Sequence, residues 1–113
     1  MNFDILIESA NEERKYFRNY LTYAKKIKEI ATKLLGKSEV FVFGSVVEGK
    51  HTPSSDIDIL IVSENVPKSL EDRAKISAKI LKEIDIFAPF ELHIVNEKEF
   101  EWYRRFLKKT IKV

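Results

Sequence analysis

The sequence contains no cysteine and has only three glycines, three prolines and one tryptophan in 113 residues. The absence of cysteine excludes disulfide bonds and thiolate metal sites, and it fits a reducing compartment. No run of about 18 apolar residues is present, so no segment is predicted to span a membrane. Residues 1–8 include acidic side chains and only a short apolar run, which is not typical of a secretory signal. Together these absences predict a cytoplasmic protein.

Charged residues of both signs are abundant, with 20 lysines and arginines against 18 aspartates and glutamates, and the net charge is only +2. So small an excess does not favour a nucleic-acid-binding protein. Basic residues do cluster within residues 25–37 and 104–112. We interpret these clusters as the solvated surfaces of helices, and a nucleic-acid-binding domain built on them stays an alternative.

The order of apolar patterns predicts a single domain over residues 1–113 with an α/β (α+β) fold. Helical spacing of apolar residues predicts an N-terminal helix at about 9–35, a helix that begins after Ser69, and a C-terminal helix at about 97–109. Short β-branched and aromatic runs predict strands at 39–43, 56–62 and 90–95, so the core that would carry the chemistry spans about 39–95. We expect a small mixed β-sheet of about three to four strands, flanked by helices.

Four local patterns predict where the helices begin and end. Ser and Asn, each followed three residues later by an acidic residue, are typical N-terminal caps, and a glycine after the last apolar residue is a typical left-handed C-terminal cap. The three N-terminal patterns begin at Ser9, Ser69 and Asn96, and the C-terminal cap is expected at Gly36.

Two aspartates stand at the start of the second predicted strand, at Asp56 and Asp58. Residues two apart on a strand point to the same face, roughly 7 Å apart at Cα. Two carboxylates so placed repel each other unless a cation lies between them. Mg²⁺ binds one or two carboxylates and completes its shell with water and phosphate oxygens. The pair therefore suits a metal–phosphate site, although a lone pair of this kind is more often simply exposed.

The first predicted strand ends at Gly44 and Ser45. A glycine at the end of a buried strand lets backbone approach a ligand closely, and the serine after it offers a hydroxyl and an N–H group to a phosphate oxygen. Alone, this pattern is equally typical of an ordinary turn. Beside Asp56 and Asp58 at the mouth of the neighbouring strand, it favours an anion site.

The third predicted strand offers Glu91 and, two residues later, His93. Glu91 could face Asp58 across the sheet and either ligate a second metal ion or take the proton of an attacking hydroxyl. An exposed edge glutamate is the alternative. We expect His93 to form hydrogen bonds on the same face rather than to act directly, and we expect His51 to lie on a loop surface.

Gly44-Ser45, the intervening loop and Asp56-Ile57-Asp58 followed by an apolar strand closely resemble the signature of the DNA polymerase β-like nucleotidyltransferase superfamily. The short chain resembles its minimal nucleotidyltransferase branch. The resemblance implies Mg²⁺ and ATP or another nucleoside triphosphate (NTP), and transfer of a nucleoside monophosphate, with AMP expected, to a hydroxyl. It also implies that Gly44 and Ser45 hold the triphosphate and that Asp56, Asp58 and Glu91 hold the metal.

The sequence departs from this family pattern at two positions. Many members carry arginine four residues after the glycine, where this chain has Glu48, and Lys50 is the nearby cation that could replace it. The third acid is glutamate rather than the more usual aspartate. Both departures affect turnover more than metal binding.

The resemblance also suggests a partner, because several members of this branch act as antitoxins of a small helical HEPN protein and some add AMP to its tyrosine. The competing hypothesis is a binding module that masks such a partner with little or no catalysis. Trp102 belongs either to a wide core face of the last helix or to a contact with a partner or a second copy of this chain, which would form a homodimer.

Overall fold

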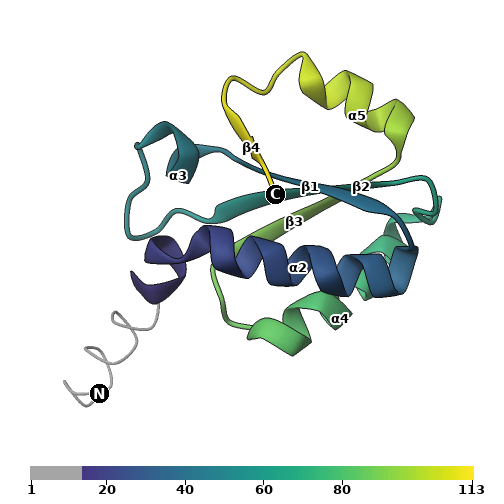
Figure 1. Cartoon of the computed structure of the whole chain (residues 1–113), viewed down its shortest axis with the longest axis horizontal. Helices are drawn as coiled ribbons and strands as arrows, with labels where there is room; N and C mark the ends of the chain where they lie inside the picture. The colour runs from purple at the N-terminus through teal and green to yellow at the C-terminus, as the bar shows by residue number, and fades with distance from the viewer. Residues whose placement is uncertain (1–13) are drawn as a thin grey trace.

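The computed structural model describes residues 14–113, which fold around one four-stranded mixed sheet (Figure 1). The elements, in chain order, are α2 (Tyr20–Leu35), β1 (Ser38–Phe43), α3 (Ser45–Glu48), β2 (Ile57–Ser63), α4 (Leu70–Ile84), β3 (Phe90–Val95), α5 (Glu97–Arg104) and β4 (Thr110–Lys112). The strand order is β3-β2-β1-β4. β2 and β3 are parallel, whereas β1 is antiparallel to both β2 and β4. The predicted mixed sheet with flanking helices is therefore confirmed.

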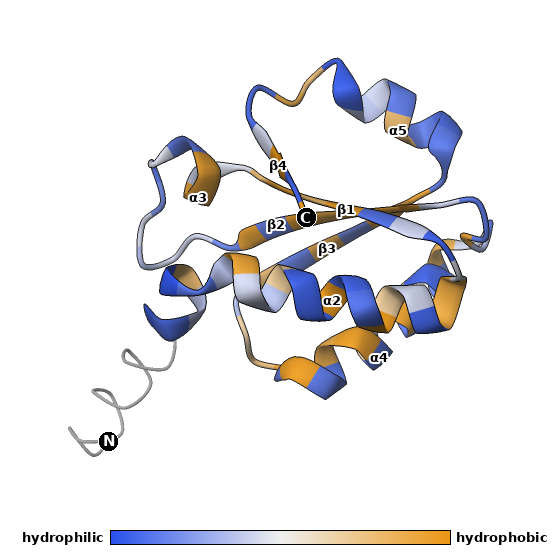
Figure 2. Ribbon diagram, in the orientation of Figure 1, coloured by the Kyte–Doolittle hydropathy of each residue, from blue (hydrophilic) through white to orange (hydrophobic). Residues whose placement is uncertain are grey.

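One face of the sheet carries the main core, against α2 and α4 (Figure 1). Ile57, Ile59 and Ile61 of β2 are fully buried there, and Ile27 and Ile80 reach them from the two helices. Figure 2 shows apolar stripes on α2 and α4 beside hydrophilic outer surfaces, as expected for helices that cover one side of a sheet. Because side chains alternate along a strand, the residues between these isoleucines point to the other face.

The second face of the sheet is covered by α5, which lies across the sheet from α2 and α4 (Figure 1). Leu60 and Val62 of β2 are buried under Phe100, Tyr103 and Leu107. Asp58 points to the same face as Leu60 and Val62, near the start of β2, and it is only partly buried. The second face thus changes from apolar to polar along β2.

The C-terminal helix that the sequence predicts to about residue 109 ends at Arg104. The chain then turns, and Thr110–Lys112 pair with Phe41–Phe43 as the fourth strand. Phe106, which the predicted helix would include, follows the end of α5 and is 65% exposed. Within the described residues, no helix has both the length and the apolar composition that a bilayer crossing requires.

Three of the four predicted caps lie within the described residues, and two of them, Ser69 and Asn96, are confirmed. Ser69 accepts from the Asp72 N–H at 3.1 Å, and Asn96 and Glu99 form a reciprocal capping box. Gly36 does end α2, but its φ of 80° and ψ of −154° place it outside the predicted left-handed helical region. The cap predicted at Ser9 lies outside the described residues, and the helical residues 14–18 are separated from α2 by a turn at Asn19.

Candidate functional site

Three side chains that could hold a metal meet where β1 ends and β2 and β3 begin. One ligand atom from each of Asp58, Glu91 and His93 lies within 4.8 Å of the others. The parallel register places Asp58 directly beside Glu91, as the sequence suggested. His93 Nε2 lies 3.3 Å from Asp58 Oδ1 and 3.8 Å from Glu91 Oε1. Glu91 is 56% exposed, so the cluster is open on its side.

Gly44 explains how the Asp58 carboxylate is held. The register pairs Phe43 with Asp58, so Gly44 comes just past the carboxylate. A Cβ on Gly44 would collide with Asp58 Oδ2 and would lie 3.1 Å from its Cγ. Gly44 also has a φ of 83°, which residues with a side chain rarely adopt. The Asp58 carboxylate is therefore fixed between Gly44 on one oxygen and His93 on the other, and only glycine leaves room for it.

Ser45 follows Gly44 and begins the short helix α3. The Gly44 carbonyl accepts from the N–H groups of Val47 and Glu48, each at 3.1 Å. Gly49, in the left-handed conformation, ends the helix, and the Lys50 N–H bonds to the Ser45 carbonyl at 2.9 Å. The Gly-Ser bend thus turns the chain away from the sheet directly beside Asp58, and Ser45 is half-buried there.

Two other residues singled out from the sequence lie farther toward solvent. Asp56 is exposed and precedes the first residue of β2, and it is not a member of the three-residue cluster. Because Asp56 lies outside the strand, the alternation along β2 that places Asp58 does not extend to it. Lys50 is exposed in the loop after Gly49.

His93 lies on the face of Asp58 and is within hydrogen-bonding distance of it, as expected from the sequence. It is 24% exposed, and besides its contact with Asp58 its ring lies 5.3 Å from Phe43 and 6.2 Å from Tyr103. The available signal was the two-residue spacing from Glu91, which is the spacing of the aspartate pair. His51, predicted on a loop surface, is exposed, and its ring stacks on Phe17 at 5.0 Å.

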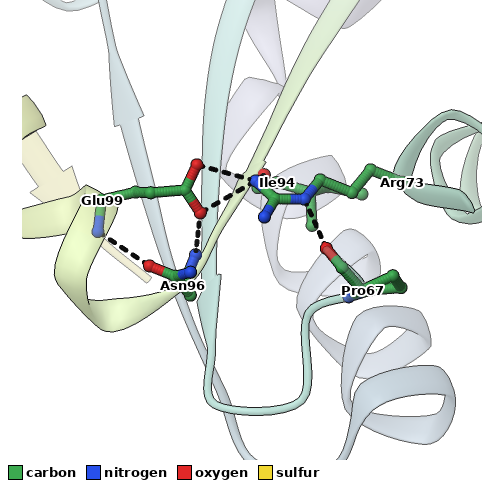
Figure 3. A network of polar contacts seen from close by, with 5 residues as sticks. All are labelled: Pro67, Arg73, Ile94, Asn96 and Glu99. Atoms are coloured by element: carbon green, nitrogen blue, oxygen red, sulfur yellow. Dashed lines mark hydrogen bonds and ion pairs between the residues drawn. The ribbon is translucent and has the colours of Figure 1, made fainter. Parts of the chain in front are cut away.

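A network around Arg73 fixes the first turn of α5 at the end of β3 (Figure 3). Arg73 of α4 donates to the carbonyls of Pro67 at 2.6 Å and Ile94 at 3.2 Å, and its Nη1 pairs with the Glu99 carboxylate at 2.9 Å. The hydrogen bond from Arg73 is the main reason that the pKa of Glu99 is lowered. The network joins the start of α4, the end of β3 and the first turn of α5.

The donors of the cluster fit a divalent cation. Asp58 and Glu91 supply the carboxylate oxygens that Mg²⁺ prefers. His93 suits a supporting position, because a hydrogen bond to a ligating carboxylate fixes its orientation. An imidazole close to two carboxylates is also compatible with Mn²⁺.

Comparison with known proteins shows the family of the chain. Residues 24–113 match the model of the nucleotidyltransferase domain family. One similar solved structure, a protein provisionally assigned as a nucleotidyltransferase, is 39% identical, with a TM-score of 0.61, over 79% of this chain and 95% of its own. Another, a nucleotidyltransferase of provisional assignment from Sulfolobus solfataricus, is 26% identical, with a TM-score of 0.59, over 94% of this chain and 83% of its own. No curated protein matches the chain significantly. The family model covers the whole sheet and the Gly44–Asp58 contact, and the chain therefore belongs to the nucleotidyltransferase domain family.

Proposed function

We propose that the chain binds Mg²⁺ and an NTP and transfers a nucleoside monophosphate, AMP in the first instance, to a hydroxyl acceptor. The observation that carries the proposal is the Asp58 carboxylate, held between Gly44 and His93 and facing Glu91. A carboxylate fixed in this way is already in position for a cation. Proteins that act on nucleoside triphosphates commonly hold Mg²⁺ through one or two carboxylates and the phosphates themselves.

Each residue of the site has a proposed role. Asp58 and Glu91, with Asp56 completing the set, hold the metal, which when bound neutralises phosphate charge and polarises the α-phosphate. Gly44 and Ser45 hold the triphosphate through close backbone approach, an N–H group and a hydroxyl. Lys50, from its exposed loop, adds positive charge.

The reaction assigned to these residues is a single displacement at phosphorus. The acceptor oxygen forms a bond to the α-phosphorus, the bond from that phosphorus to the bridging oxygen breaks, and pyrophosphate leaves. The proton of the acceptor hydroxyl passes to Glu91, the more exposed carboxylate. His93 keeps Asp58 in its orientation by hydrogen bonding and takes no part in bond making.

The test follows the fate of each phosphate of ATP. Label from α-³²P-ATP should appear on an acceptor, whereas label from γ-³²P-ATP should not. Asp58→Asn should slow transfer by about 100-fold or more, the scale seen when one charge-stabilising group is lost. Asp72→Asn is the matched control, because it removes an exposed carboxylate from α4, 57% exposed and away from the cluster. Transfer that survives Asp58→Asn unchanged would remove the basis of the proposal.

The acceptors to test include a small alcohol, the chain itself and a tyrosine of a helical HEPN-type partner. A second candidate function is that the chain masks such a partner without modifying it. Glu48 favours this, because it puts a negative, half-buried side chain on α3 where relatives carry a phosphate-neutralising arginine. Under masking, Asp58→Asn binds and silences the partner as well as the wild type does. Under transfer, silencing is lost with the label.

A further inference from the structure

A ladder of aromatic rings leads from the candidate metal site to solvent. His93, which contacts Asp58, lies 6.2 Å from the ring of Tyr103, edge to face. Tyr103 lies 5.4 Å from Trp102, and Trp102 lies 4.7 Å from Phe106. The last two rings are 58% and 65% exposed. This aromatic ladder is therefore buried at the metal end and open at the other.

The exposed end of the ladder is not part of the core. Phe100, Tyr103 and Leu107 are the side chains of this segment that pack over the second face of the sheet. Trp102 lies in the last turn of α5, rotated by about 200° from Phe100, and Phe106 lies in the turn that follows the helix. Two large aromatic side chains in mutual contact and left exposed beside a polar site mark a binding surface more often than a packing defect.

We propose that Trp102 and Tyr103 form the stacking surface for the base of the bound NTP. The inference rests on the proposed function, which places the phosphates at Asp58 and Gly44. The base must then lie some distance from the metal along an accessible surface, and the ladder begins at the residue that contacts Asp58. Stacking on an aromatic ring uses the face of a base and not the hydrogen-bonding groups on its edge. Such a surface therefore holds a base and discriminates weakly between different bases.

The other flank of α5 is less suited to a base. It contains a hollow of about 310 Å³ lined by Phe41, Phe100, Arg104, Leu107, Thr110 and Lys112. Arg104 and Lys112 would favour an anionic group over a neutral base. Both are already paired with acids, Arg104 with Glu101 at 3.1 Å and Lys112 with Glu39 at 3.4 Å.

The experiment compares Mg²⁺–ATP with Mg²⁺–tripolyphosphate, which has the phosphates and no base, by calorimetric titration of the full chain. Trp102→Ala should weaken ATP binding by at least about fivefold and leave tripolyphosphate binding unchanged. Trp102→Phe, which keeps a ring, should retain most of the ATP affinity. Leu70→Ala removes an apolar side chain that is 80% exposed at the start of α4 and should change neither. Because Trp102 is the single tryptophan, its fluorescence should respond to ATP and not to tripolyphosphate.

The possible failures are distinguishable. If Trp102→Ala binds ATP as the wild type does while Asp58→Asn weakens both ligands, the base lies elsewhere and the proposed function stands. If Trp102→Ala weakens ATP and tripolyphosphate equally, the stacking role is refuted. Fluorescence that shifts with protein concentration and ignores ATP would assign Trp102 to self-association and overturn the proposal. If neither ligand responds to Asp58→Asn, the proposed function fails first.

Discussion

Replacing Gly44 by alanine should damage stability and metal binding at once, for two separable reasons. The backbone at Gly44, with φ 83° and ψ −158°, is strained for any residue with a side chain, at a cost of about 1–3 kcal/mol. In a domain of this size that lowers the unfolding midpoint by about 5–20 °C. In addition, the new Cβ collides with the Asp58 carboxylate, which has to rotate away from the position that His93 and Gly44 define.

Gly49→Ala provides a matched control within the same short segment. Gly49 is also left-handed, with φ 71° and ψ 22°, and alanine there costs about 1–2 kcal/mol. A Cβ on Gly49 would meet no atom within 4 Å. This variant therefore carries backbone strain of a similar size and leaves the Asp58 carboxylate in place.

The assay is thermal unfolding of the three proteins with and without Mg²⁺–ATP, together with metal titration at a temperature where all three are folded. A ligand at 100 times its dissociation constant adds about 2.7 kcal/mol to the stability of a protein that binds it only when folded. Gly49→Ala should keep the ligand-induced rise in midpoint, and Gly44→Ala should lose most of it. If both variants respond to Mg²⁺–ATP equally, the Asp58 carboxylate does not depend on Gly44 and the reasoning is wrong.

Three further outcomes are expected. His93→Ala should weaken Mn²⁺ binding by about 10–100-fold in calorimetric titration because Asp58 loses its orienting partner, and His93→Gln should lose less. Arg73→Ala should lower the free energy of unfolding in urea by about 2 kcal/mol or more, because it removes the guanidinium that donates to two carbonyls and to Glu99. As the control, Arg104→Ala, which removes an exposed ion pair, should lower it by less than about 0.5 kcal/mol. Because the fold lowers the pKa of Glu99 from its ordinary value of 4.5, the ionised carboxylate stabilises the fold above pH 4.5, and this contribution disappears as the pH falls through the lowered pKa. Glu99→Gln should therefore have a lower free energy of unfolding than the wild type at pH 7, and the difference should vanish in strong acid, as measured by acid-unfolding curves.

Much of this fold follows from local sequence. The three longer strands come from β-branched runs whose alternation or full burial decides which face each side chain takes. Ser69 and Asn96 are caps because their side chains satisfy N–H groups that a helix start leaves open. The pairing of Asp58 with Glu91 was also predictable, because both acids stand at the beginning of strands that enter the sheet from the same end.

What could not be predicted depends on long-range pairing. Thr110–Lys112 contains the β-branched Thr110 and Ile111, but the segment is only three residues long, and its strand is defined by pairing with the edge of β1. His93 is expected on this face from the sequence, and its 3.3 Å distance from Asp58, 35 residues away, follows from the same β2–β3 register that pairs Asp58 with Glu91.

The early end of α5 is the departure with the largest consequence for the site. Tyr103, in the last turn of the helix, already contacts His93, which lies two strand positions inward from the Glu91–Asp58 pair. Five more helical residues, as the apolar spacing suggested, would extend α5 by about 7.5 Å toward and over that pair. The longer helix would then cover the two carboxylates and reduce the access of a metal ion to them. By ending at Arg104 and returning as β4, the chain covers Leu60 and Val62 and leaves Asp58 and Glu91 open to a metal and its phosphate ligand.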